Sequence, residues 1–234
     1  MADSRRRAGS ATTTTADSGE MDAHVFSLPD AIVHVVDDDP DLREVMAELL
    51  ATVGLETRTY GSAESYLAAN KPDRPSCLVL DVQLAGASGL DLQRQMRDAG
   101  AMTPIVFISG HGDVAMSVRA LRAGAVTFLS KPFDSVDLID AVREGLDRDR
   151  RARARRREHD EIERLHAGLT RREREVLAGV IAGHSNKHIG RELGITEVTV
   201  KLHRAHVMQK LRVTTLAELV RLEEKRRARN ASGD

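Results

Sequence analysis

Over roughly the first 150 residues, short apolar runs alternate with stretches of helical periodicity. Apolar runs that predict buried strands occupy 32–36, 77–80, 105–108 and, more weakly, 126–129. Helices are predicted from Pro40 to just before Gly54, and at about 62–69, 90–99, 113–123 and 135–146. Buried strands that alternate with helices form parallel sheets covered on both faces, so this half predicts an α/β doubly wound, flavodoxin-like parallel sheet.

The first and last of these helices carry the clearest apolar faces. The first is capped by Asp39 and opened by Pro40. Its residues predicted to face the sheet are Leu42, Val45, Met46, Leu49 and Leu50. In the last helix they are Val136, Ile139, Val142 and Leu146.

From Leu169 onward the pattern changes, and no further strand is predicted. Four helix starts are marked by capping residues, namely Thr170 with Glu173, Ser185, Thr196, and Thr215 with Glu218. The third of these helices is expected at 197–211. Four short helices with tight connections predict a small all-α domain.

These patterns divide the chain into five segments. A tail at 1–29, rich in Ser, Thr and charge, is expected to be disordered. The sheet domain takes 30–147 and the helical domain 166–227, and a second disordered tail is expected at 228–234. Between the domains, 148–165 lacks Gly and Pro and predicts a charged helical linker that extends the helix at 135–146.

The net charge of −1 conceals an acidic half and a basic half. Residues 31–145 hold 10 Lys and Arg against 17 Asp and Glu, whereas residues 166–226 hold 12 against 7. Seven arginines fall within 148–157. The basic half therefore favours a polyanionic partner. The single Cys77 excludes a disulfide framework, and no apolar run approaches a membrane span, so a soluble, cytoplasmic protein is expected.

Charged and hydroxyl side chains stand at the ends of the predicted strands. They are Asp37 and Asp38, Asp81, Ser109 and Lys131. Parallel strands bring such ends to one sheet edge, and clustered carboxylates call for a cation. Oxygen ligands suit Mg²⁺, and Asp81 is then a plausible nucleophile for phosphoryl transfer. The metal and Lys131 would neutralise the charge of the transferred phosphoryl group.

The helix at 197–211 has two distinct sides. Val200, His203, Val207 and Leu211 form the predicted core stripe, and the opposite side offers Val198, Lys201, Leu202, Ala205 and Gln209. Apolar side chains beside a lysine suit the major groove of DNA, where they meet thymine methyls and guanine acceptors. The preceding helix starts with Ser185-Asn186-Lys187, which can hold phosphate.

The strand-end motifs resemble those of receiver domains in two-component response regulators. The matching segments are Val36-Asp37-Asp38-Asp39, Leu80-Asp81-Val82, Ile108-Ser109-Gly110 and Lys131-Pro132-Phe133. The resemblance implies that a histidine kinase phosphorylates Asp81 and that Asp37, Asp38, Asp81 and the backbone carbonyl of Gln83 hold Mg²⁺. It further implies that Ser109 and Lys131 bind phosphoryl oxygens and that Phe128 repacks as a switch with Ser109.

The helical half resembles the LuxR-type helix-turn-helix, and the domain order is similar to NarL/FixJ-type regulators, particularly the FixJ branch. The segments are Leu169–Leu177, Ser185-Asn186-Lys187-His188-Ile189 and Thr199-Val200-Lys201-Leu202-His203-Arg204. The resemblance implies base contacts from Lys201, Leu202 and Ala205 and backbone contacts from Lys187, His203, Arg204 and His206. It predicts a phosphorylation-dependent transcriptional regulator that changes its dimerisation or domain docking, with promoter DNA, a second copy and RNA polymerase as partners.

Three positions depart from the family pattern. Ala85 replaces the usual Pro after Leu84, which leaves the phosphoryl lifetime open, and His188 and Gly190 replace Glu and Ala. Gly in a helix interior costs about 1 kcal/mol, which predicts a softer helix. A metal site at His184, His188 and His203 is disfavoured because their neighbours supply no carboxylate or thiolate.

Other functions stay open at this stage. A phosphatase of the haloacid dehalogenase type needs an acid two residues after the nucleophile, where this chain has Gln83, so the chain is not expected to be an enzyme. A DNA-binding protein that acts without phosphorylation, and an adaptor whose helices bind protein, are the remaining alternatives.

Overall fold

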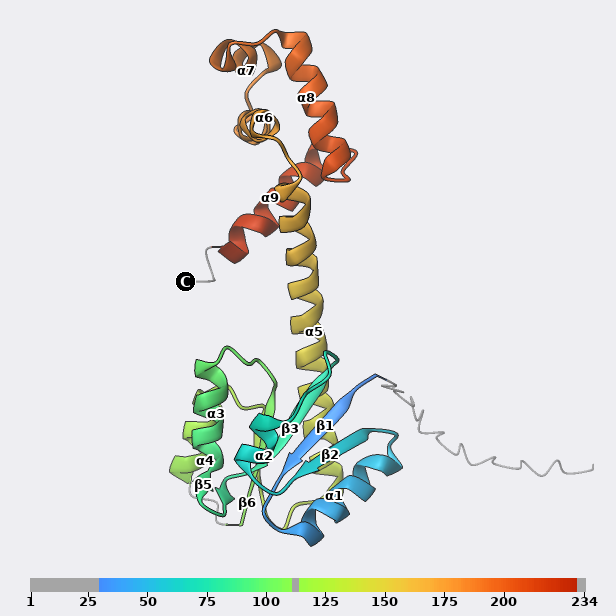
Figure 1. The fold of residues 1–234 in the computed structure, drawn as a ribbon, viewed down its shortest axis with the longest axis vertical. Coiled ribbons are helices and arrows are strands. Elements are labelled where there is room, and N and C mark those ends of the chain that lie inside the picture. Colours follow the sequence, from blue (N-terminus) through green and yellow to red (C-terminus); the bar gives the residue numbers. More distant parts are fainter. Residues whose placement is uncertain (1–29, 111–113, 231–234) are drawn as a thin grey trace, which may run out of the picture.

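A computed structural model describes residues 30–110 and 114–230 of the chain. A sheet domain and a smaller helical domain stand at opposite ends of one long helix (Figure 1). The tail predicted at 1–29 lies outside the described residues, as do 231–234. Residues 228–230 belong to the last helix, so the prediction of a tail from 228 onward was wrong there.

The sheet has five parallel strands in the order β2-β1-β3-β6-β7. These are β1 (Ile32–Val36), β2 (Glu56–Tyr60), β3 (Ser76–Asp81), β6 (Ile105–Ser109) and β7 (Thr127–Ser130). All residues of β1, β3 and β6 are buried, as their apolar runs predicted. Strand β2 was not predicted because it lies at the sheet edge, where its polar residues face solvent.

Helices cover both faces of the sheet, which confirms the doubly wound class. α1 (Pro40–Thr52) and the start of α5 (Ser135–Ala167) pack on one face. α2 (Ala63–Ala68), α3 (Gly89–Asp98) and α4 (Val114–Arg122) pack on the other. The short pair β4 (Gln83–Leu84) and β5 (Ala87–Ser88) precedes α3. The predicted helix at 113–123 corresponds to α4, and residue 113 lies outside the described residues.

Two valines predicted to face the sheet are exposed instead. Val45 is 58% exposed and Val136 is 60% exposed. Each lies beside the true buried stripe: Met46 and Leu50 carry it in α1, and Leu138 and Val142 carry it in α5. Val45 is one residue from Met46 and Val136 is two residues from Leu138, and such offsets turn a side chain by about 100° and 200°, enough to move it from the core to solvent.

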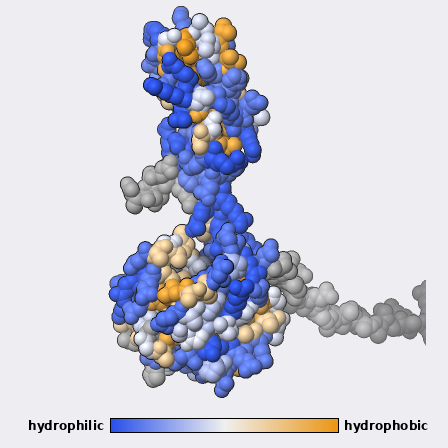
Figure 2. Space-filling view, in the orientation of Figure 1, coloured by the Kyte–Doolittle hydropathy of each residue, from blue (hydrophilic) through white to orange (hydrophobic). Residues whose placement is uncertain are grey.

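α5 is a single helix of 33 residues. It joins the predicted helix at 135–146 to the predicted charged linker without a break and spans about 50 Å. The middle of α5 forms a hydrophilic neck between the domains (Figure 2). Asp149 fastens this helix to the sheet: its carboxylate is buried and accepts hydrogen bonds from the backbone N–H of Ser76 at 2.8 Å and from Arg153 at 2.7 Å.

The helical domain contains α6 (Arg171–Ile181), α7 (Asn186–Leu193), α8 (Glu197–Lys210) and α9 (Leu216–Asn230). The side chains of Thr170, Ser185 and Thr196 cap α6, α7 and α8 as predicted. Thr215 accepts from the N–H of Glu218, which confirms the fourth start. The domain has its own apolar core, formed by residues that include Val176, Ile189, Val200, Val207 and Leu219.

Candidate functional site

The strand-end carboxylates meet at one edge of the sheet. Asp37 follows β1, Asp81 ends β3, and one carboxylate oxygen from each of Asp37, Asp38 and Asp81 lies within 4.8 Å of the other two. Asp37 and Asp81 are buried, whereas Asp38 is exposed. This donor set consists of oxygen atoms from three carboxylates beside open solvent, which fits Mg²⁺.

Lys131 bridges the two buried carboxylates. Its ammonium nitrogen Nζ lies 2.9 Å from Oδ2 of Asp37 and 2.5 Å from Oδ2 of Asp81. Burial acts to lower the pKa of Lys131, but the hydrogen bonds to Asp81 and Asp37 outweigh it and raise that pKa. Burial raises the pKa of Asp37, against the opposing effect of Lys131. The Lys131 ammonium is therefore a protonated cation, hydrogen-bonded at the point where the carboxylates converge.

The remaining predicted residues of this pocket surround the same edge. Ser109 ends β6 and is fully buried, and its backbone carbonyl accepts from the N–H of Lys131 at 2.7 Å. The backbone N–H of Gln83 donates to Oδ1 of Asp81 at 2.8 Å. Phe128, on β7, is half-buried with its ring centroid 6.5 Å from that of Phe107. All five predicted strand-end groups thus come together.

Two residues that position this pocket were not singled out from the sequence. Gly89 is the first residue of α3, and the backbone carbonyl of Asp81 occupies the space that a Cβ atom on Gly89 would take. Arg43 donates to the backbone carbonyl of Asp37 at 2.7 Å. Neither contact follows a local sequence pattern, since each joins a helix to the end of the preceding strand of the five-stranded sheet.

On α8, the side predicted to read DNA is exposed. Lys201, Leu202 and Ala205 face solvent, with Leu202 54% exposed, and Val198 beside them is 75% exposed. The opposite residues Val200 and Val207 are buried in the domain core. A protruding apolar and basic helix face is therefore present where the sequence predicted it.

The predicted backbone-contact residues differ in their surroundings. Lys187 and His206 are exposed, and His203 is half-buried. Arg204 is also half-buried and donates to the side-chain oxygen of Asn186 at 2.7 Å, which joins α8 to the start of α7. Arg204 thus has a structural partner besides any contact with DNA.

Leu216, Leu219 and Val220 of α9 are apolar residues that could pair two helical domains, and they differ in exposure. Leu219 is 2% exposed and belongs to the core of its own domain, so it is not available to a second copy. Leu216 is 49% exposed and Val220 is half-buried.

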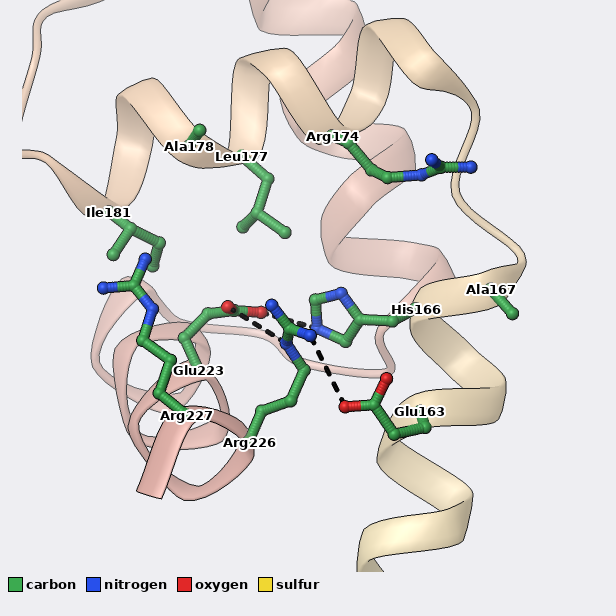
Figure 3. Close-up of a pocket in the computed structure, with 10 residues that line it drawn as sticks. All are labelled: Glu163, His166, Ala167, Arg174, Leu177, Ala178, Ile181, Glu223, Arg226 and Arg227. Atoms are coloured by element: carbon green, nitrogen blue, oxygen red, sulfur yellow. Dashed lines mark hydrogen bonds and ion pairs between the residues drawn. The ribbon is translucent and has the colours of Figure 1, made fainter. Parts of the chain in front are cut away.

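The end of α5 meets the helical domain around a pocket of about 510 Å³ (Figure 3). At its base, Nε2 of His166 lies 2.5 Å from Oε1 of Glu223 on α9, and both side chains are buried. Arg226 is close to Glu223 and Glu163, at 3.5 and 3.4 Å. The His166–Glu223 contact and the ion pair between Arg226 and Glu163 hold α9 against the linker, far along the chain from the carboxylate pocket.

Profiles of two known families match the chain. The response regulator receiver domain matches residues 33–143, and the bacterial regulatory proteins of the luxR family match residues 167–222. The chain belongs to the luxR-type response regulators. It is thus a phosphorylation-dependent transcription regulator, with a histidine kinase and DNA as partners. Receiver domains generally use Mg²⁺, which the donor set of the carboxylate pocket fits.

Similar response regulators span nearly the same length. Nodulation protein W of Bradyrhizobium diazoefficiens is 45% identical over 201 residues, which cover 86% of this chain and 88% of that protein. The transcriptional regulatory protein FixJ of Azorhizobium caulinodans is 41% identical and covers 84% and 92%. The solved response regulator StyR has a TM-score of 0.79 at 46% identity, covering 84% of this chain and 99% of that chain. No helix in residues 30–110 and 114–230 is both long enough and apolar enough to span a membrane.

Proposed function

We propose that this response regulator accepts its phosphoryl group on Asp81 and reads DNA with the exposed face of α8. The observation that carries the proposal is the bridge from Lys131 to Asp37 and Asp81 at the carboxyl edge of the sheet. A cation already held between carboxylates is poised to receive the negative charge of a phosphoryl group.

In this proposal, Asp37, Asp38, Asp81 and the backbone carbonyl of Gln83 hold Mg²⁺, which supplies charge neutralisation at the transferred phosphoryl group. A carboxylate oxygen of Asp81 attacks the phosphorus of a phosphohistidine on the kinase. The new P–O bond forms as the P–N bond breaks, and the imidazole leaves. The N–H of Gln83 keeps Oδ1 of Asp81 oriented during the transfer.

The charge of the new phosphoryl group then changes the partners of the side chains around it. Phosphorylation adds about −1.5 to −2 charges. Lys131 exchanges one carboxylate partner for a phosphoryl oxygen, and Ser109 supplies a hydroxyl to another. Phe128, which is only half-buried, turns into the space that the movement of Ser109 opens. The surface of α4, β7 and α5 changes as a result.

The output is proposed to be DNA binding by a homodimer at a promoter, with RNA polymerase as a further partner, in the cytoplasm. Lys201, Leu202 and Ala205 contact bases, and Lys187, His203, Arg204 and His206 contact the backbone. The receiver is proposed to control either dimerisation or domain docking, and not to turn over external substrates, because Gln83 stands where a phosphatase needs its acid.

Replacement of the phosphoacceptor tests the first half. Asp81→Asn is expected to abolish Mg²⁺-dependent labelling by radiolabelled acetyl phosphate, together with the gain in DNA affinity that the phosphodonor produces. Asp98→Asn, an exposed carboxylate at the end of α3, is the matched control and should label like wild type. Unchanged labelling of Asp81→Asn contradicts the assignment.

Replacement of a base-contact residue tests the second half. Lys201→Ala should weaken binding to a duplex selected by the wild type by about 1–3 kcal/mol and relax the preference at one position. Lys225→Ala, on α9, is the control because its ammonium pairs with Glu158 on the linker. An equal loss on every sequence would make Lys201 a phosphate contact, and salt-insensitive or absent binding would favour the protein-binding adaptor.

A further inference from the structure

Two histidines and a glutamate form a cluster on the helical domain, away from the carboxylate pocket. His184 lies in the turn before α7, and His188 and Glu192 follow at intervals of four residues on α7. One ligand atom from each of the three lies within 4.8 Å of the other two. The metal site that sequence reasoning disfavoured for want of a carboxylate thus has one, from Glu192 and without His203. We propose that His184, His188 and Glu192 bind a divalent transition-metal ion of the Zn²⁺ class.

The separations suit direct coordination. Nε2 of His188 is 3.2 Å from Oε1 of Glu192, and Nδ1 of His184 is 3.5 Å from its Oε2. Zinc binds histidine nitrogen and carboxylate oxygen at about 2.0–2.2 Å, so neighbouring ligands on a tetrahedron lie about 3.3–3.5 Å apart. The two imidazole rings are already gathered, with centroids 4.3 Å apart. An ion can therefore enter with small side-chain rotations.

The donor types select the class of ion. Two imidazoles and one carboxylate suit Zn²⁺, Co²⁺, Ni²⁺ or Cu²⁺ and leave a position for water, whereas Mg²⁺ prefers oxygen ligands only. The side chains are 39%, 37% and 50% exposed, so the ion has access from solvent. Mg²⁺ in the receiver and this ion in the helical domain are thus separable by chemistry.

Arg191 opposes loading of the site. Its guanidinium nitrogen lies 3.3 Å from Nδ1 of His188. Arginine only donates, so Nδ1 accepts there and the ring proton stays on Nε2, the atom that must face the metal. Loading through Nε2 moves the proton to Nδ1 and requires the exposed Arg191 side chain to turn away. Removal of this arginine is therefore expected to tighten metal binding.

Metal binding would fasten the turn before α7 to the last turn of that helix. At present the turn is attached by the backbone N–H of His184, which donates to the carbonyl of Gly179 at 3.0 Å. An ion held only by the folded domain stabilises it by mass action. Loading is therefore expected to raise the melting temperature of the helical domain, whether or not the receiver is phosphorylated.

The test is titration of the full chain with Co²⁺ and then Zn²⁺, with excess Mg²⁺ present to occupy the carboxylate pocket. Wild type should bind one equivalent of Co²⁺ with the intense visible absorption of four-coordinate cobalt, which Zn²⁺ then displaces. His188→Gln and Glu192→Gln should each lose this absorption and the rise in melting temperature, and Arg191→Gln should strengthen both.

The matched control is His159→Gln, an imidazole on the linker helix, which should behave as wild type. Binding that survives Glu192→Gln, or a loss of equal size in His159→Gln, overturns the proposal. Absence of four-coordinate absorption in wild type also overturns it and makes the cluster a set of surface His–Glu pairs. Labelling of Asp81 is measured in the same samples, so a failure of the proposed phosphorylation is seen separately.

Discussion

At position 89, the backbone of α3 touches the backbone carbonyl of Asp81. The N–H of Gly89 also donates to the carbonyl of Val82 at 2.8 Å, so the start of α3 is fixed against the end of β3. A side chain at this position has no room, and glycine is required by close approach of two backbones and not by a turn.

Gly89→Ala is therefore expected to displace Asp81 from Lys131. Overpacking of this kind should lower the stability of the receiver by about 1–3 kcal/mol and slow its phosphorylation by acetyl phosphate. Urea unfolding and the labelling rate measure the two effects. Gly61→Ala is the matched control, because its new Cβ would meet the guanidinium of Arg43 at 3.6 Å, an ordinary contact.

Glu173 joins the start of α6 to the end of α8. Its buried carboxylate accepts from the N–H of Thr170 and from Lys210 at 2.8 and 2.7 Å. Burial acts to raise the pKa of Glu173, but the hydrogen bonds from Lys210 and Thr170 outweigh it and lower that pKa to about 2. The ionised form is therefore the one that stabilises the fold.

Since this folded-state pKa lies below the ordinary value of 4.5, the stabilisation is complete above about pH 4.5 and is lost as the pH falls toward 2. Glu173→Gln keeps a capping side chain but removes the charge, and should destabilise the helical domain by about 1–3 kcal/mol at neutral pH. The difference from wild type should shrink in acid unfolding series. Glu175→Gln, which removes more exposed ion pairs, should show a smaller effect.

Site residues were predictable from the sequence where their position at the end of a strand places them together. Asp37, Asp81, Ser109 and Lys131 each end or follow a strand, so a parallel sheet alone brings them together. Gly89 and Glu192 were missed for a different reason. The need for glycine at 89 arises from a backbone that approaches in space, and Glu192 acts only because α7 aligns it with His188 and with the preceding turn.

At the scale of elements, α5 is attached to β3 by one buried carboxylate. Asp149 accepts from Ser76 and Arg153, and Arg153 also pairs with Asp73. This contact lies past residue 147, the predicted end of the receiver, so the first turns of the linker are attached to the sheet domain. A displacement of β3 is therefore expected to displace the helix as well.

Asp149→Ala should leave the N–H of Ser76 and the guanidinium of Arg153 without this acceptor. The expected cost is about 1–3 kcal/mol in receiver stability. Amide hydrogen exchange should become faster at Ser76 and along the linker near residue 153. Asp147→Ala removes an exposed pair with Arg150 at 4.0 Å and is expected to change neither. Equal exchange in the two variants would argue against the attachment.

Strands with a run of apolar residues were predictable, and the strand without such a run was not. β2 was missed because an edge strand with exposed polar residues lacks the buried run that marked its neighbours. The linker helix was expected from its composition, since helix formers without Gly or Pro continue a helix that has started. Its contact with β3 could not be read from the sequence, because Asp149 looks like one more charge in a charged run.

At the scale of the molecule, ion pairs join the helical domain to the linker beside the apolar contact of Leu165 with the domain core. Besides His166 and Glu223, Lys225 pairs with Glu158 at 2.5 Å and Arg212 with Glu161 at 3.1 Å. Exposed pairs of this kind contribute about 0–1 kcal/mol each and weaken with salt. Raised ionic strength is therefore expected to weaken these exposed pairs between the linker and the helical domain.

Because one unbroken helix joins the domains, the number of residues in it determines the angle between them about the helix axis. Each residue of an α-helix advances by about 100° and 1.5 Å. Two residues inserted after Arg157, in the exposed part of α5, should turn the DNA-reading face by about 200°. Seven inserted residues should restore its direction to within about 20° while moving it about 10 Å outward.

Phosphorylation-dependent DNA binding by the proposed homodimer is accordingly expected to fall with the two-residue insertion and to be retained better with seven, as measured by mobility shift on a selected duplex. Equal behaviour of both insertions would show that the domains act as if loosely tethered. In the proposed dimer, the length of this linker would set the direction of each α8 relative to the helical repeat of the DNA.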